Sequence, residues 1–336
     1  MRVAIVTNSD FSGVINRFGQ SYPQPQPPQH WPHSYTVQDV VAALQEGGHE
    51  TLLCEGDKGL LARLERFMPP DPQGRPSGMV FNLAEGIQGE HRFTHVPAML
   101  EMAGVPYTGS GPLGHGLTQD KVMTKTLIRD VGVPTPNFRV MRRGNESTGD
   151  LRFPVVVKPR CEDSSLGLQL VHEPANLKQA VELIATQYAQ YALVEEYIEG
   201  REICVALLGN GEPEVFPLVE QDFGDRETRL RTWETKFVAA AAVPNICPAQ
   251  IESGLATVLR EISVACFHAC QCRDYARVDV RIDRSGQPFV LETNSPGLGM
   301  HSSYVTAATT AGYSFTSLIN RILNIAHTRC FGIGVA

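Results

Sequence analysis

Short hydrophobic runs bounded by turn residues alternate with longer amphipathic segments along most of this chain, and this alternation restricts the fold more than any other feature. Strands that alternate with helices usually form parallel or mixed sheets covered by helices. In the first third, strands are expected at 2–6, 50–56 and 78–83. Helices are expected at 36–48, 59–68 and 95–104, with Thr36 as a cap of the first. The sequence therefore predicts the α/β class, beginning with an open α/β domain.

A segment rich in glycine and proline, PYTGSGPLG at 106–114, predicts a domain boundary near residue 110. Next comes a predicted helix at 117–136, stopped by Gly132 and Pro134. Further on, the pattern predicts a long helix at 249–271 and a pair of strands at 275–294 with a tight turn at 284–286. Between them lie short segments, predicted as strands at 153–159, 166–172, 191–198, 201–209 and 214–219 and one helix at 176–190.

The segment 18–35 is rich in Pro and Gln, so it can form neither a helix nor a full strand ladder. We expect a surface connector there, with a lid or a partner-binding arm as the alternative.

Composition narrows the classes of function. With 336 residues, the chain is longer than one ordinary domain, and its net charge of −7 gives no basic surface for nucleic acid. No apolar run approaches the roughly 20 residues that cross a bilayer, and the first residues predict a strand instead of a signal peptide. We expect a cytoplasmic protein that binds neither nucleic acid nor membrane.

The eight cysteines include no C-x-x-C pair, which indicates reduced thiols and not a disulfide framework. Cys266, His268, Cys270 and Cys272 are close enough in sequence to suggest zinc. They lie in an apolar helical stretch, however, where Cys266 and Cys270 share a face that Cys272 cannot join. A buried helix face is the favoured interpretation.

The strand pair at 275–294 carries the most specific cluster of polar residues. Alternation with period two places Arg277 and Asp279 on one face of the first strand, and Glu292 and Asn294 on one face of the second. Antiparallel pairing brings the four together. Two carboxylates and an amide oxygen are ligands suited to a magnesium ion that bridges nucleotide phosphates, and the guanidinium can stabilise a phosphoryl group in transfer. A solvated surface hairpin is the alternative.

Two further segments are weaker candidates. In 155–167 a strand ends in Lys158 and leads into a loop with Ser164 and Ser165, which is able to bind phosphate oxygens. Lys121, taken alone, is better explained as a solvated lysine. In 192–202, the backbone of a strand could bind an adenine edge and a carboxylate four residues later could accept from ribose, although an exposed edge strand is equally possible.

Taken in order, these segments resemble the ATP-grasp superfamily, and specifically the D-alanine–D-alanine ligases and their relatives, over almost the whole chain. The resemblance implies three domains: an N-terminal α/β domain at 1–109, and two ATP-grasp domains at 110–198 and 199–336 that hold ATP between them. It is carried by 80–111, 117–136, 154–167, 193–209 and 275–297.

The resemblance also implies roles for individual residues. Arg277 would hold an acyl phosphate, Lys236 would reach the γ-phosphate, and Ser164 and Ser165 would belong to a lid over the phosphates. The metal ligands for two magnesium ions, or manganese in their place, would be Asp279, Glu292 and Asn294. ATP would be bound by Lys121, Lys158, Ser164, Ser165, Glu195, Glu196, Tyr197, Ile198, Glu202 and Lys236.

The sequence departs from this family where the substrates would bind. The turn after the first strand, 7–20, lacks the family's glutamate for the first substrate's ammonium, and Asp10 does not occupy the same position. Glu85 stands where the family has histidine. Phe237 replaces a tyrosine whose hydroxyl would link the mobile loop to Ser164.

The segment after Asn294 also differs from the family, so Gly297, Ser302 and Ser303 are tentative substrate residues. We therefore expect an ATP-dependent ligase that joins an acid to an amine through an acyl phosphate, on substrates other than two D-alanines, and relatives suggest a homodimer. The alternatives are a genuine D-alanine–D-alanine ligase of cell-wall synthesis and a non-catalytic ATP-binding sensor or scaffold.

Overall fold

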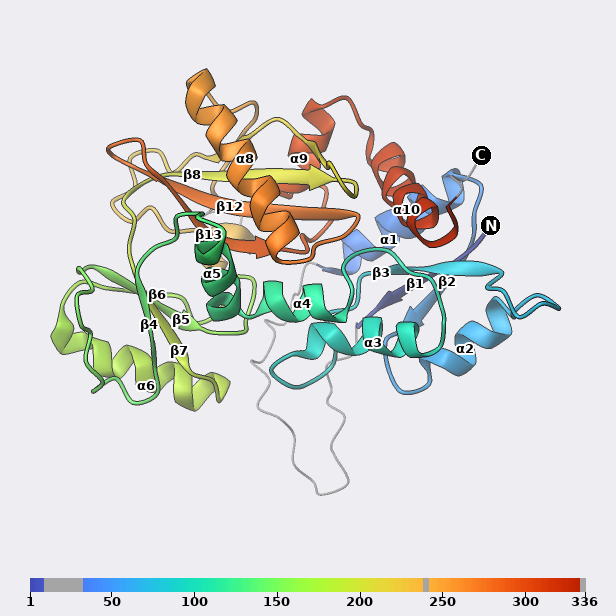
Figure 1. Ribbon diagram of the computed structural model, residues 1–336, viewed down its shortest axis with the longest axis horizontal. Coiled ribbons are helices and arrows are strands. Elements are labelled where there is room, and N and C mark those ends of the chain that lie inside the picture. The colour runs from blue at the N-terminus through green and yellow to red at the C-terminus, as the bar shows by residue number, and fades with distance from the viewer. Residues whose placement is uncertain (9–32, 238–241, 333–336) are drawn as a thin grey trace.

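The computed structural model describes residues 1–8, 33–237 and 242–332 (Figure 1). Asp10 lies outside them. So does the Pro- and Gln-rich segment, apart from its last three residues, which belong to the first helix. The proposed role of that segment as a lid or arm therefore stays a hypothesis.

The chain begins with a three-stranded parallel sheet of order β2-β1-β3. The strands are β1 (Arg2–Thr7), β2 (Glu50–Glu55) and β3 (Gly78–Asn82), as the hydrophobic runs predict. Helix α1 (His33–Glu46) begins three residues before Thr36, so the prediction that Thr36 caps this helix is wrong. The other helices of this part are α2 (Leu60–Phe67), the short η1 (Arg92–Thr94) and α3 (His95–Met102).

Both faces of this parallel sheet are covered. Strands alternate their side chains, so Ala4, Val6 and Val80 pack on α2 and α3, whereas Val3, Ile5, Met79 and Phe81 face α1. Helix α10 (Phe315–Phe331) returns from the end of the chain and packs beside α1 (Figure 1). The last helix thus shares a hydrophobic core with the first sheet.

The middle of the chain forms a four-stranded antiparallel sheet of order β4-β7-β5-β6. Its strands are β4 (Phe138–Met141), β5 (Val155–Pro159), β6 (Gln169–Val171) and β7 (Ala192–Glu196). A short turn η2 (Pro174–Asn176) leads into α6 (Leu177–Tyr188), whose Leu177, Val181 and Ile184 pack on this sheet.

The segment 117–136 forms parts of two helices instead of the one predicted: α4 (Pro112–Gln119) and α5 (Lys121–Asp130). The reason is Asp120, whose backbone is extended and whose carboxylate accepts hydrogen bonds from the backbone N–H groups of Val122 and Met123. An aspartate in this geometry caps a new helix. As a result, Lys121 is the first residue of α5.

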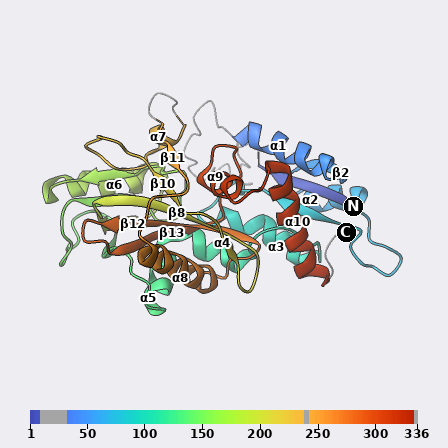
Figure 2. The same ribbon diagram turned by 90° about the horizontal axis from the view of Figure 1, so that it is seen from above.

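The largest sheet has the order β11-β10-β8-β12-β13, with β9 paired to β8. Helix α8 (Ser253–Ala269) packs on one face, α9 (Ser303–Thr310) lies on the other, and the short α7 (Trp233–Phe237) precedes β11 (Figure 2). The strands are β8 (Gly200–Leu208), β9 (Glu214–Val215), β10 (Val219–Gln221), β11 (Asn245–Ile246), β12 (Tyr275–Asp283) and β13 (Pro288–Asn294).

The cysteines at the end of α8 agree with the expectation of a buried helix face. Cys266, Cys270 and Cys272 are all buried, and burial raises the pKa of each thiol. Among the described residues, these three do not form a group whose sulfur atoms all lie within 4.8 Å of one another, so the prediction that Cys272 cannot join the other two in a zinc site is confirmed.

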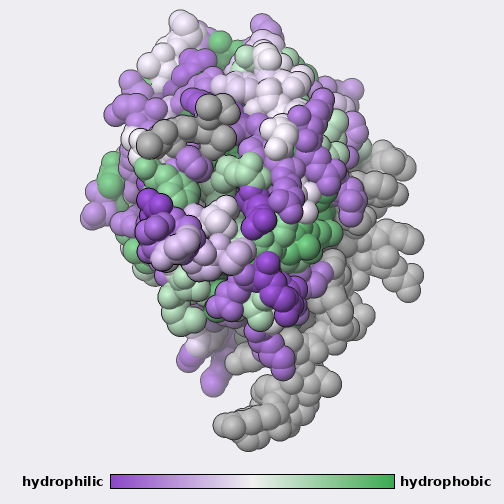
Figure 3. Space-filling view, turned by 90° about the vertical axis from the view of Figure 1, so that its right-hand side faces the viewer, coloured by the Kyte–Doolittle hydropathy of each residue, from purple (hydrophilic) through white to green (hydrophobic). Residues whose placement is uncertain are grey.

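Within the described part of the chain, no helix is long and apolar enough to cross a bilayer. On the side of the molecule that carries α1, α2 and α10, hydrophilic side chains predominate and break up the apolar ones (Figure 3).

Candidate active site

The hairpin of β12 and β13 brings the four predicted polar residues together. Arg277 pairs directly with Asn294 across the two strands, and Asp279 with Glu292. The amide nitrogen of Asn294 lies 3.2 Å from a carboxylate oxygen of each acid. Arg277 donates two hydrogen bonds of 2.7 Å to Asp279. The oxygen ligands and the guanidinium therefore share one face, as alternation predicts.

Cations from other elements surround this cluster. The Nζ atom of Lys121 lies 3.6 Å from Glu292. Burial by itself would raise the pKa of Glu292, but the charges of Lys121, Lys158, Lys236 and Arg277 outweigh it and hold that pKa well below its usual range. Glu292 is therefore ionised at neutral pH, as a metal ligand must be.

Lys236, on α7, faces the same cluster. Burial, and then the neighbouring guanidinium of Arg231, lower the pKa of Lys236 to about 8 against the opposing charges of Glu292 and Asp279. A lysine poised near neutral pH in this position is able to approach a polyphosphate and to respond strongly to its charge.

Beside this cluster, the carboxylate of Glu195 ion-pairs with two lysines. Its carboxylate lies 2.5 Å from Lys158 Nζ and 2.7 Å from Lys125 Nζ, and only 2% of its side chain is exposed. Lys125 also donates to Thr135 at 2.8 Å. That Glu195 lines adenine stays a prediction, and its side chain contacts Lys158. Lys125 is not predicted from the sequence, although the spacing of four from Lys121 places both on one face of α5.

The residues that follow Glu195 line a cavity. Glu196, Tyr197 and Ile198 border it together with Phe289 of β13. Glu196 also ion-pairs with Arg152, another residue of the same cavity, at 2.7 Å.

Glu202 is buried beside the equally buried Arg281, at 3.3 Å. Burial raises the pKa of Glu202, and the positive charge of Arg281 opposes the rise. Arg281 is not predicted from the sequence, although period-two alternation places it on the same face of β12 as Arg277 and Asp279.

The loop between β5 and β6, residues 160–168, has strained backbone at its centre. Ser164 and Ser165 have φ values of 51° and 60°, in a region that residues other than glycine rarely adopt. Such strain is typical of ligand-binding loops. Ser165 donates a hydrogen bond of 2.6 Å to the carbonyl of Arg231, which ties this loop to the segment preceding Lys236.

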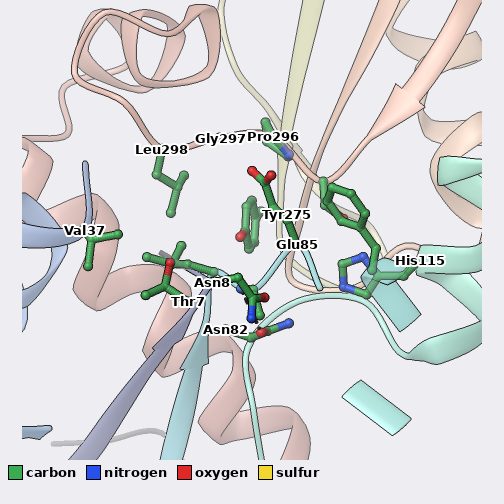
Figure 4. Close-up of a pocket in the computed structure, with 14 residues that line it drawn as sticks. Thr7, Asn8, Val37, Asn82, Glu85, His115, Tyr275, Pro296, Gly297 and Leu298 are labelled. Atoms are coloured by element: carbon green, nitrogen blue, oxygen red, sulfur yellow. Dashed lines mark hydrogen bonds between the residues drawn. The ribbon is translucent and has the colours of Figure 1, made fainter. Parts of the chain in front are cut away.

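A second cavity lies at the carboxyl ends of β1 and β3. Glu85 and His115 line it, below Pro296 and Gly297 of the loop after β13, and Tyr275 lies beside Glu85 (Figure 4). Burial, together with the charge of Asp163, raises the pKa of Glu85 to about 8. Of the tentative substrate residues, Glu85 and Gly297 therefore line one cavity.

The two tentative serines lie elsewhere. Ser302 caps α9 by accepting a hydrogen bond from the backbone N–H of Val305 at 3.2 Å, and Ser303 is buried in the first turn of that helix. Neither lines the cavity around Glu85.

Comparison with known proteins adds information about ancestry. A family model described as the C-terminus of D-ala D-ala ligase matches residues 127–324. Over its whole length the chain is 73% identical to an uncharacterized protein, y4sG, of Sinorhizobium fredii, covering 99% of that protein.

Relatives named as D-alanine–D-alanine ligases are less similar to this chain. A D-alanine–D-alanine ligase of Pelotomaculum thermopropionicum is 34% identical over 247 residues, covering 70% of this chain and 76% of the relative. One of Moorella thermoacetica is 31% identical over 298 residues, covering 85% and 92%. The solved D-alanine–D-alanine ligase from Bacillus anthracis complexed with ATP superimposes with a TM-score of 0.74 at 21% identity, covering 98% of both chains, which shows the same fold.

Proposed function

Because this chain belongs to the D-alanine–D-alanine ligase family of ATP-grasp enzymes, and is thus an ATP-dependent, ADP-forming ligase, we propose that it joins a carboxylic acid to an amine through an acyl phosphate, on substrates other than two D-alanines. The observation that carries this proposal is the convergence of Lys121, Lys158, Lys236 and Arg277 on the carboxylate of Glu292. Such a concentration of cations suits the transfer of a phosphoryl group.

The β12–β13 hairpin also fits a metal. Asp279 and Glu292 offer carboxylate oxygens and Asn294 an amide oxygen, the hard ligands that magnesium or manganese prefers. These residues would hold the ion or ions that accompany the nucleotide. A bound metal would neutralise charge on the phosphates during transfer.

The protein's own groups then have distinct tasks. A carboxylate oxygen of the acid attacks the γ-phosphorus of ATP and ADP leaves, while Lys121, Lys158 and Lys236 stabilise the charge of the phosphates. The amine nitrogen next attacks the acyl carbon, loses a proton, and inorganic phosphate leaves. Arg277 is placed to stabilise the oxyanion, and the 160–168 loop to exclude water.

The residues of this chain differ from those of the family where the substrates would bind, and this difference supports a substrate pair other than two D-alanines. The cavity below Gly297 contains the carboxylate of Glu85 where the family has an imidazole. A genuine D-alanine–D-alanine ligase is the second candidate, and the names of relatives with up to 34% identity favour it.

The proposal is tested by incubating the purified protein with ATP, magnesium and a pool of small metabolites. We expect ADP release and a product whose mass equals that of two pool members minus water, whereas D-alanine alone should give neither. Formation of D-alanyl-D-alanine at ordinary efficiency would contradict the substrate part of the proposal.

Arg277→Ala separates an enzyme from an ATP sensor. The loss of charge stabilisation should reduce turnover by about 100-fold or more, with ATP affinity changed only a few-fold. Arg284→Ala, in the exposed turn of the same hairpin, is the matched control and should keep full turnover. A wild-type protein that binds ATP but never releases ADP with any pool fraction would support the sensor.

A further inference from the structure

Arg231 lies in a segment whose backbone is fixed by three hydrogen bonds from side chains. Ser165 donates to the carbonyl of Arg231 at 2.6 Å. Two residues earlier, the carbonyl of Arg229 accepts from Arg281 at 2.6 Å and from Tyr197 at 3.4 Å. The three donors come from the loop after β5, from β12 and from the residue that follows β7. The position of Arg231 is therefore set by three separate parts of the fold.

The guanidinium of Arg231 acts on one face of the large sheet. Residues of β8 alternate between the core beneath α8 and the opposite face, where Glu202 and Cys204 lie. Cys204 pairs there with Asp279 of β12. Burial raises the pKa of both Glu202 and Cys204, and the charge of Arg231 is among those that oppose the rise. Because electrostatic effects weaken with distance, Arg231 lies over the face that also carries Asp279.

Arg231 also lies beside Lys236, the lysine that we expect at the γ-phosphate. After burial, the charge of Arg231 is the largest cause of the lowered pKa of Lys236, ahead of the opposing charge of Glu292. The two cations are therefore close together. Like charges at close range repel each other, and an anion that binds between them removes the repulsion.

One donor of the Arg231 side chain lacks an acceptor. Its Nε atom is buried and has no hydrogen-bond partner among the described residues. A buried donor without an acceptor is costly, and a ligand that supplies the acceptor removes the cost. A guanidinium offers a planar fork of N–H donors that fits the oxygens of a phosphate group. A phosphate group beside Lys236 would therefore supply the acceptor that Arg231 lacks.

We propose that Arg231 binds the γ-phosphate of ATP together with Lys236 and stabilises it during transfer. The inference rests on the proposed ligase function and adds a catalytic residue to it. In the transfer, a carboxylate oxygen of the acid forms a bond to the γ-phosphorus, and the bond from this phosphorus to the β–γ bridging oxygen breaks. The electron pair of the broken bond stays on ADP. Arg231 donates hydrogen bonds to the γ-phosphoryl oxygens throughout the transfer.

The first test compares nucleotides with and without a γ-phosphate. Calorimetry with the full-length protein and magnesium measures the affinity for ADP and for an imido analogue of ATP. Arg231→Met keeps a long side chain but removes the charge and the donors. It should weaken binding of the imido analogue by about tenfold and change binding of ADP by less than about twofold. Equal weakening of both nucleotides, or of neither, would overturn the assignment.

Two further variants separate contact with the phosphate from a general effect of charge. Arg231→Lys restores a positive charge without the planar fork, and should bind the imido analogue more tightly than Arg231→Met but less tightly than the wild type. Arg260→Met removes an exposed arginine of α8, which packs on the other face of the large sheet, and should bind both nucleotides as the wild type does. No recovery with lysine, or an equal loss in Arg260→Met, would contradict the assignment.

Turnover distinguishes a catalytic residue from one that only binds. With ATP, magnesium and the active fraction of the metabolite pool, Arg231→Met should release ADP about 100-fold more slowly than the wild type at saturating ATP. A variant that reaches the full rate at saturating ATP would show that Arg231 does not stabilise the transfer.

A second assay reports on the ligase function alone. With ATP, a pool of acids and hydroxylamine, an acyl phosphate is trapped as a hydroxamate. A selective loss of affinity for the imido analogue in Arg231→Met, without any hydroxamate from the wild type, would support phosphate binding by Arg231 and contradict the acyl phosphate. Hydroxamate formed at equal rates by the wild type and Arg231→Met would support the ligase and overturn the inference.

Discussion

At the scale of a single residue, Glu85 links the cavity below Gly297 to the stability of the protein. Its pKa is raised from 4.5 to about 8, chiefly by burial and then by Asp163. Below pH 4.5 the carboxyl of Glu85 is protonated in both the folded and the unfolded chain, so it does not lower the free energy of unfolding. As the pH rises from 4.5 toward 8, only the unfolded chain loses this proton, so the free energy of unfolding falls progressively. Above pH 8 the folded chain also loses the proton, and the free energy of unfolding falls no further.

Glu85→Gln should therefore raise Tm in the absence of substrates, and the gain should grow with pH. We expect a clearly higher Tm than wild type at pH 8.5 and nearly equal values at pH 4.5, measured by thermal denaturation. Glu90→Gln should follow the wild type throughout, since its side chain is exposed. A gain for Glu85→Gln that is the same at both pH values would show that the carboxyl does not titrate as described.

At the scale of an element, the start of α5 positions Lys121. Asp120 caps this helix and also ion-pairs with Arg160, whose Nε donates to it at 2.8 Å. Asp120→Ala removes the cap and the partner of Arg160, and should lower the free energy of unfolding by about 2 kcal/mol. Fraying of the first turn should raise KM for ATP several-fold, because Lys121 is the first residue of the helix.

Asp120→Asn distinguishes the two contributions, since asparagine caps a helix but carries no charge. It should recover about half of the lost stability and most of the affinity for ATP. Urea denaturation and steady-state kinetics measure both. If alanine and asparagine were equally harmful, the ion pair and not the cap would position Lys121.

The same element shows what the sequence could not predict. Hydrophobic periodicity placed the strands of the first sheet and the β12–β13 hairpin because these depend on local alternation. The same periodicity predicted one helix where α4 and α5 form. An aspartate inside a helical pattern becomes a cap only when tertiary contacts, here with Arg160, hold its backbone extended. Helical spacing puts Lys125 on the face of Lys121, but only the folded chain shows that Glu195 binds it.

At the scale of the whole molecule, three segments that are far apart in sequence meet at one buried carboxylate, that of Asp274. Asp274, just before β12, accepts hydrogen bonds from the backbone N–H of Gly109 and the side chain of Asn210, both at 2.8 Å. Arg329 of α10 ion-pairs with it at 2.8 Å and also donates to the carbonyl of Tyr107. The N-terminal domain, the large sheet and the last helix therefore meet at Asp274.

Arg329→Met should destabilise the protein by about 3 kcal/mol, because it leaves the carboxylate of Asp274, which is 0% exposed, without its cation. Since α10 also covers the N-terminal sheet, the loss should loosen that domain first, and urea denaturation should separate into two transitions. Arg321→Met, on the exposed face of the same helix, should change neither the midpoint nor the shape of the curve. A single transition for Arg329→Met with the midpoint of the control would mean that apolar packing of α10 on α1 suffices to unite the domains.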